Sequence, residues 1–128
     1  MTRWLLLAML ACNGGPPSVE PNQVQPAITA LNQALDDLVE ADAGGDPFTA
    51  KKHWRNAHGV WDETLGPALE PRIGPKATLE LELHLARIRH DLKVQPGAAE
   101  KHVNALRTAL ESPLKSMPQA PPAPQDPQ

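Results

Sequence analysis

The stretch Thr78-Leu79-Glu80-Leu81-Glu82-Leu83-His84-Leu85 decides whether this chain contains a β-strand. Apolar and polar residues alternate strictly along it, which is the pattern of a strand with one buried face. Leucine and glutamate are nevertheless strong helix formers, and no β-branched residue follows Thr78 within the stretch. When the sequence is continued, a helical stripe emerges from Leu81, Leu85, Ile88 and Leu92. We therefore predict a helix over residues 76–94.

This segment also has a second apolar face. Leu79, Leu83 and Ala86 fall opposite the stripe at 100° per residue. The pattern predicts a helix that is either buried on two sides or paired with a second copy of the chain in a homodimer.

Three further segments have the same helical spacing of apolar residues. Residues 25–43 begin with Pro26 near the first helical position and end before a glycine pair; residues 47–65 follow Asp46 as N-cap; and residues 98–114 follow a Pro-Gly pair. The residues expected to face inward are Val24, Ile28, Leu31, Leu35 and Leu38 in the first, Ala50, Trp54, Ala57, Trp61 and Leu65 in the second, and Val103, Leu106 and Leu110 in the last.

Glycine and proline separate these segments. Gly44-Gly45 follows the first, Gly66-Pro67 is expected to kink or end the second, residues 71–75 form a proline-containing connection, and Pro96-Gly97 ends the third. Short connections place successive helices antiparallel. We therefore predict an all-α fold: one up-down-up-down four-helix bundle over residues 25–116.

The first residues have the layout of a secretory signal. Arg3 precedes the apolar run of residues 4–11, which is too short to span a bilayer, and Cys12 comes next as the only cysteine of the chain. The run Met9-Leu10-Ala11-Cys12 resembles the lipobox of bacterial lipoproteins. The resemblance implies a cleaved signal over residues 1–11 and lipid attachment at Cys12.

The lipoprotein resemblance implies a location. The chain would be anchored to the bacterial cell envelope through lipid on Cys12, and Asn13 in place of aspartate favours the outer membrane, facing the periplasm. Residues 12–24, with Gly14-Gly15-Pro16-Pro17, read as a flexible linker, and the proline-rich residues 117–128 read as a disordered tail. With the thiol committed to lipid, catalysis by cysteine is excluded.

Charge and composition exclude another class of function. Twelve Lys and Arg face fifteen Asp and Glu, for a net charge of −3, which argues against nucleic acid as a partner. Acidic residues gather near the end of the first segment, and we expect Lys51, Lys52 and Arg55 to neutralise them; the acidic residues are Asp36, Asp37, Glu40, Asp42 and Asp46.

Four side chains are candidate metal ligands. His58 and Asp62 are four residues apart on the second segment, and Glu80 and His84 are four apart on the third. If these segments pack side by side, two imidazoles and two carboxylates suit zinc, copper or iron. The alternative is ordinary surface pairs at helical spacing. Haem would require axial ligation by two histidines from His53, His58, His84, His90 and His102.

A second resemblance covers residues 50–92. Trp54, Ala57 and Trp61, then Pro67 and Leu69, and then the pattern Leu81-Glu82-x-x-Leu85-x-x-Ile88-Arg89-x-x-Leu92 are similar to periplasmic helical domains associated with bacterial high-affinity iron permeases. Such domains are helical bundles linked to iron delivery. Gly66 stands where that family leads us to expect an acidic residue.

Two functions follow as hypotheses. The first is a non-enzymatic, membrane-anchored lipoprotein whose helical bundle binds a protein partner or supports the cell envelope. The alternative is a periplasmic metal-binding lipoprotein that uses His58, Asp62, Glu80 and His84 for iron or copper.

Overall fold

The computed structural model describes residues 21–117, and all regular secondary structure in that range is helical. The elements are α2 (Pro21–Ala43), α3 (Pro47–Val60), the π-helical turn η1 (Trp61–Leu65), α4 (Gly66–Val94) and α5 (Ala99–Lys115). The alternating stretch at residues 78–85 lies inside α4, so the all-α prediction is confirmed for the described residues. The predicted signal, Cys12 and residues 118–128 of the predicted tail lie outside them.

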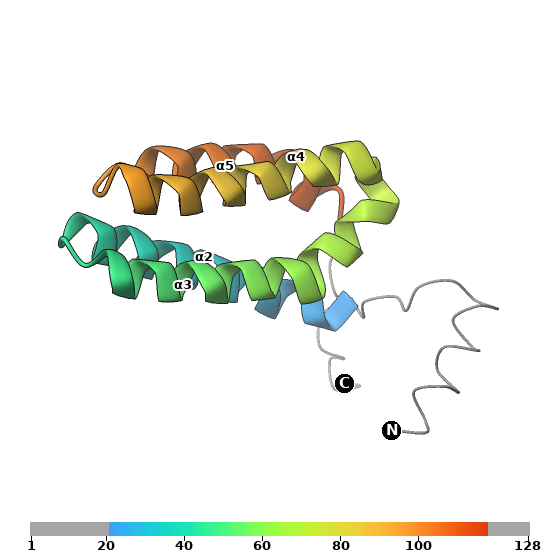
Figure 1. Cartoon of the computed structure of the whole chain (residues 1–128). Helices are drawn as coiled ribbons and strands as arrows, with labels where there is room; N and C mark the ends of the chain where they lie inside the picture. Colours follow the sequence, from blue (N-terminus) through green and yellow to red (C-terminus); the bar gives the residue numbers. More distant parts are fainter. Residues whose placement is uncertain (1–20, 118–128) are drawn as a thin grey trace, which may run out of the picture.

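The helices are arranged as two hairpins (Figure 1). α2 lies beside α3, and the long second part of α4 lies beside α5. The hairpins contact each other through α3 with α4 and through α2 with α5. No helix in the described range is long and apolar enough to cross a membrane.

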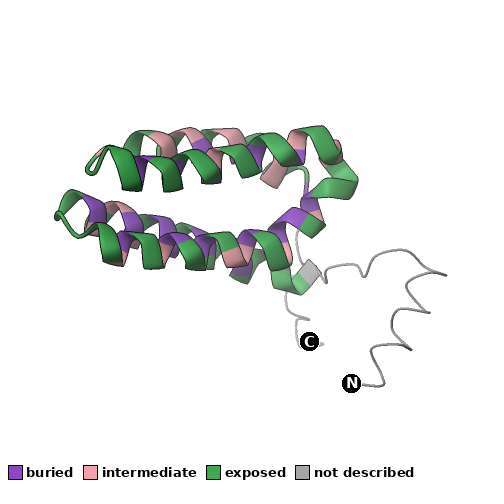
Figure 2. Cartoon of the chain, in the orientation of Figure 1, coloured by how far each residue is buried: buried purple, intermediate pink, exposed green. Residues whose placement is uncertain are grey.

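The core comes from the apolar stripes read in the sequence. Buried residues line the inner faces of both hairpins, whereas the outer faces are exposed (Figure 2). Burying one leucine stabilises the fold by about 1.5–3 kcal/mol, so stripes on four segments supply the main driving force. The most completely buried side chains are Leu31, Leu35, Leu38, Trp61, Leu65, Leu69, Leu85, Ile88, Val103 and Leu106.

The first helix starts earlier than the sequence indicated. α2 begins at Pro21, so residues 21–24 of the predicted linker are helical. Val24 and Ala27 are buried at 4% and 7% exposure, and Val24 is one of the residues predicted to face inward. Pro26 lies inside the helix, in its second turn, so its missing N–H removes only one hydrogen bond near the helix start.

Gly66-Pro67 does not end the second segment. The Gly66 N–H bonds to the carbonyl of Trp61, five residues back, so the chain makes a π turn and continues into α4. The wider turn comes directly before Pro67, which has no N–H to offer. The residues from Gly66 to Ile73 are therefore helical, where the sequence predicted a connection over residues 71–75.

The chain turns at Gly74 instead. Its φ of 91° and ψ of 162° break the helix, and Pro75 begins the long second part of α4. This region of backbone space is essentially restricted to glycine. The Thr78 hydroxyl donates to the Gly74 carbonyl at 2.7 Å and closes the corner.

Met117 also departs from the prediction. It was assigned to the tail, but its side chain is 7% exposed and packs in the core. The neighbouring Ser116 carbonyl accepts a hydrogen bond of 3.1 Å from Arg72 Nη1, which ties the end of α5 to the first part of α4.

Candidate functional site

The four predicted metal ligands do not converge. His58 faces α4, where it lies near Glu82 and Arg89, whereas His84 lies on the other flank of α4, near His102 of α5. Within residues 21–117, no three His, Cys, Asp or Glu side chains come together in a group that could hold a metal ion.

The positions of these residues around the axis of α4 explain why the predicted metal site does not form. Residues 82 and 89 fall on the flank of the α4 stripe that faces α3, while residues 80 and 84 fall on the flank toward α5. Asp62 is exposed on the π turn. The predicted pairs therefore lie on different sides of the molecule.

His84 is half-buried, and its Nδ1 has no hydrogen-bond partner among the described residues. Burial lowers the pKa of His84, and the nearby charges of Arg87 and His102 lower that pKa further, while Glu80 acts in the opposite sense. At neutral pH the ring is therefore uncharged. His102 itself pairs with the buried carboxylate of Asp91, which joins α5 to α4.

The described residues form a groove between α3 and α4, which we call the α3–α4 groove. Its volume is about 710 Å³. The side chains that line it come from two helices. α3 contributes Pro47, Phe48, Lys51, Trp54 and His58, and α4 contributes Glu82, Ala86, Arg89, His90, Leu92 and Lys93. This size falls in the range of ligand-binding pockets in proteins.

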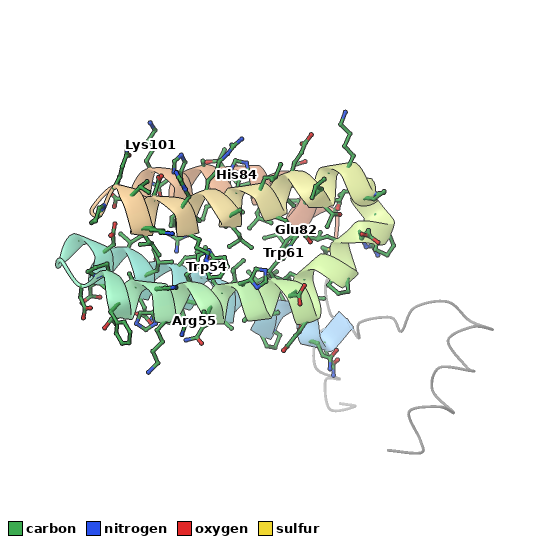
Figure 3. The ribbon with its side chains drawn as sticks, in the orientation of Figure 1. Trp54, Arg55, Trp61, Glu82, His84 and Lys101 are labelled. Atoms are coloured by element: carbon green, nitrogen blue, oxygen red, sulfur yellow. The ribbon has the colours of Figure 1, made fainter. Side chains whose placement is uncertain are left out.

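Trp54 forms the floor of the groove and is held by three contacts. Its Nε1 donates to the Leu85 carbonyl at 2.7 Å, across the boundary between α3 and α4. The His58 ring stacks on it at 4.9 Å between centroids and 14° between planes, and the Arg89 guanidinium lies over it at 5.2 Å. Trp54 points inward between the helices, whereas Arg55 points away from them (Figure 3). The indole is therefore fixed in one orientation.

The walls of the groove are positively charged. Lys51, Arg89 and Lys93 line it, and the single carboxylate is that of Glu82. Glu82 Oε1 accepts a long hydrogen bond of 3.4 Å from the Trp61 indole. None of the three cations forms an ion pair with any residue of the described range.

Phe48 stands at one end of the groove with 81% of its surface exposed. The start of α3 is well fixed there, because Asp46 Oδ1 accepts a hydrogen bond of 3.1 Å from the Thr49 amide. That hydrogen bond lowers the pKa of Asp46, so the cap persists into mildly acidic conditions. Aromatic residues, Phe included, are enriched at protein interfaces.

No known protein family, curated protein or solved structure matches the chain. The chemistry of the groove is therefore argued from its own residues. The resemblances to lipoproteins and to iron-permease-associated domains stay predictions.

The sequence did not reveal this groove, because the basic residues of α3 are expected there to neutralise the acidic residues near the end of α2. In the structure, Asp36 pairs with Arg107 of α5 at 2.6 Å, and the buried Asp42 accepts the amides of Gly97 and Ala99. Lys51 instead lines the groove. A detectable signal was the run of Glu82, Ala86, Arg89 and Lys93 at three- and four-residue steps beside the buried stripe.

The second apolar face of the third segment is exposed. Leu79 and Leu83 are 55% and 47% exposed, so this face is not buried on two sides by the described residues. Ala86, which the sequence grouped with them, lines the groove. The homodimer stays a prediction, and sedimentation of the wild type and of Leu83→Lys would test it.

Proposed function

We propose that this protein is a non-enzymatic lipoprotein of the bacterial cell envelope that holds a protein partner in its α3–α4 groove. The observation that carries the proposal is the groove itself. It combines a fixed aromatic floor, an exposed phenylalanine and unpaired cations. Aromatic and arginine side chains dominate the energetics of protein interfaces.

The proposed architecture is an antiparallel four-helix bundle. Three sets of contacts between the hairpins support it: Trp54 with the Leu85 carbonyl, Arg107 with Asn32 and Asp36, and Asp42 with the start of α5. They join α3 to α4 and α2 to α5, which is the pattern of neighbours around a bundle.

A binding role fits the groove better than catalysis. Its lining contains no serine, threonine or cysteine to serve as a nucleophile. Lysine, arginine and imidazole groups around an aromatic floor are suited to recognition of a charged ligand.

The anchor is proposed from the sequence alone. The apolar run of residues 4–11, the small residue Ala11 and the single Cys12 support it. Two or more acyl chains hold a protein stably at a membrane, because each buried methylene contributes about 0.8 kcal/mol. Incorporation of a labelled fatty acid by the wild type but not by Cys12→Ser is the expected result, and equal labelling of the two would refute the anchor.

Photocrosslinking in intact bacterial cells that express the full chain tests the binding role. We expect a photoreactive residue at Phe48 to give one discrete cross-linked product. The matched control is the same residue at Lys101, which is exposed and points away from the groove (Figure 3). A product that forms equally at both positions, or at neither, would contradict the proposal.

A further inference from the structure

We infer that the α3–α4 groove recognises an acidic segment of its protein partner, in which carboxylate side chains flank an apolar one. The inference rests on the proposed function and specifies its ligand. It comes from a contrast of charge: the whole chain carries −3, whereas the groove places three cations and two histidines around one carboxylate. A basic site selects for acidic ligands through electrostatic complementarity.

The cations are available to a ligand. Lys51 and Lys93 have no counter-ion within residues 21–117, and Glu82, the acid nearest to them in the lining, is engaged by Trp61. Arg89 lies over the Trp54 ring. A guanidinium that stacks on an aromatic face keeps its in-plane N–H groups free for a carboxylate.

The groove is also prearranged. The Trp54 indole is fixed by the Leu85 carbonyl, and it in turn positions Arg89 and His58. Groups that need no reordering on binding lose little conformational entropy, which favours affinity. Phe48, at one end, offers the apolar contact that a purely ionic site would lack.

Fluorescence anisotropy with the purified full chain tests the inference. The probe is a short labelled peptide of glutamate and leucine, and its control is the same peptide with glutamine in place of glutamate. We expect the acidic peptide to bind at least about tenfold more tightly, and its affinity to fall as salt rises to about 150 mM, because partly exposed charges are screened.

Charge reversal locates the site. Lys93→Glu and Arg89→Glu should each weaken binding of the acidic peptide by about tenfold or more, because each removes a charge-assisted contact. Lys101→Glu is the matched control, since it makes the same charge change on an exposed site outside the groove, and it should alter affinity by less than about twofold.

Three outcomes would overturn the inference. They are equal binding of the two peptides, equal loss of affinity in Lys93→Glu and Lys101→Glu, and a dimer in the absence of peptide that Phe48→Glu dissociates, since a second copy would then fill the groove. If the two peptides bind equally but Phe48 still gives a specific cross-link, only the preference for acidic ligands is refuted. If that cross-link does not form, the proposed function is refuted, whatever the result with the peptides.

Discussion

Trp54 makes contacts of three kinds, and two of them, with the Leu85 carbonyl and with Arg89, reach from α3 to α4. It donates a hydrogen bond to a backbone carbonyl, stacks on an imidazole and lies under a guanidinium. Only 8% of its surface is exposed, so it contributes both to the core and to the floor of the groove. Stability and binding should therefore change together when this side chain is altered.

Trp54→Phe should lower the free energy of unfolding by about 2 kcal/mol. The hydrogen bond to Leu85 accounts for about 0.5–1.5 kcal/mol, and the lost indole contacts account for the rest. Urea denaturation followed by circular dichroism measures the change. Arg55→Ala, on the exposed face of α3, should alter it by less than about 0.5 kcal/mol. An unchanged midpoint for Trp54→Phe would show that the hydrogen bond is not formed.

His84 should make stability depend on pH. Burial lowers its pKa in the folded state, and the groups that face it are Arg87 and Glu80 on α4 and His102 on α5. The unfolded chain then binds more protons below about pH 6.5, so stability falls as the pH drops from about 7 to 5. Because the ring is partly exposed, solvent keeps the effect modest.

The comparison of His84→Gln with the wild type isolates this contribution. Urea midpoints at about pH 7 and pH 5 should differ less in the variant, because it lacks the half-buried imidazole. If the two proteins lose the same stability on acidification, the half-buried imidazole is not responsible.

At the scale of elements, the least regular feature is the corner at Gly74. Gly74→Ala should destabilise the protein by about 1–3 kcal/mol, because an alanine at φ of 91° and ψ of 162° is strained. A Cβ there meets no atom within 4 Å, so the cost is conformational rather than steric.

Gly59→Ala is the matched control for that corner. Gly59 lies within α3, and a Cβ there also meets no atom within 4 Å. The substitution should raise stability by up to about 1 kcal/mol through helix propensity. Thermal unfolding measures both variants, and equal shifts would show that the Gly74 backbone carries no strain.

The elements were predictable to the extent that side-chain periodicity determines them. The buried stripe of Leu81, Leu85, Ile88 and Leu92 gave the long part of α4 despite the alternating pattern within it. The prolines were harder to interpret. A π turn before Pro67 lets the helix continue, and a Cβ at Gly66 would lie only 3.0 Å from the Trp61 carbonyl oxygen and 3.3 Å from the Trp61 Nε1, so this turn favours glycine.

The candidate site was less predictable than the helices. Whether α4 presents Glu82 or His84 to α3 depends on which flank of its stripe meets the hairpin of α2 and α3, and both flanks carry acids and histidines. Asp36 pairs with Arg107, which is 71 residues away in the sequence. Because such a distant pairing cannot be predicted from local sequence, neither could the position of Lys51 in the groove.

In the whole molecule, the two hairpins contact each other through α2 with α5 and through α3 with α4, and the contacts differ between these two sides. Between α2 and α5, Arg107 bonds to Asn32 and Asp36, and Asp42 Oδ1 and Oδ2 accept the amides of Gly97 and Ala99 at 2.9 and 3.1 Å. Between α3 and α4, Trp54 donates to the Leu85 carbonyl, and the small side chain of Ala86 lines the groove beside these helices. The groove therefore opens on this side.

Asp42→Ala should lower the free energy of unfolding by about 3 kcal/mol. Asp42 is 4% exposed, and the substitution removes the acceptor of two amides at the start of α5. Asp37→Ala, which removes only a local bond to Gln33, should cost less than about 0.5 kcal/mol. Similar midpoints for the two variants in urea would show that Asp42 does not join the hairpins.

The central claim is that the α3–α4 groove is the working surface of the protein. The most direct measurement is a titration of the ¹⁵N-labelled full chain with the glutamate–leucine peptide, followed by ¹H–¹⁵N spectra. We expect the largest shifts on the Trp54 indole and on the amides of Lys51, Arg89 and Lys93, while the signals of α5 stay in place. Shifts that concentrate on α2 and α5, or that spread evenly over the helices at saturation, would contradict it.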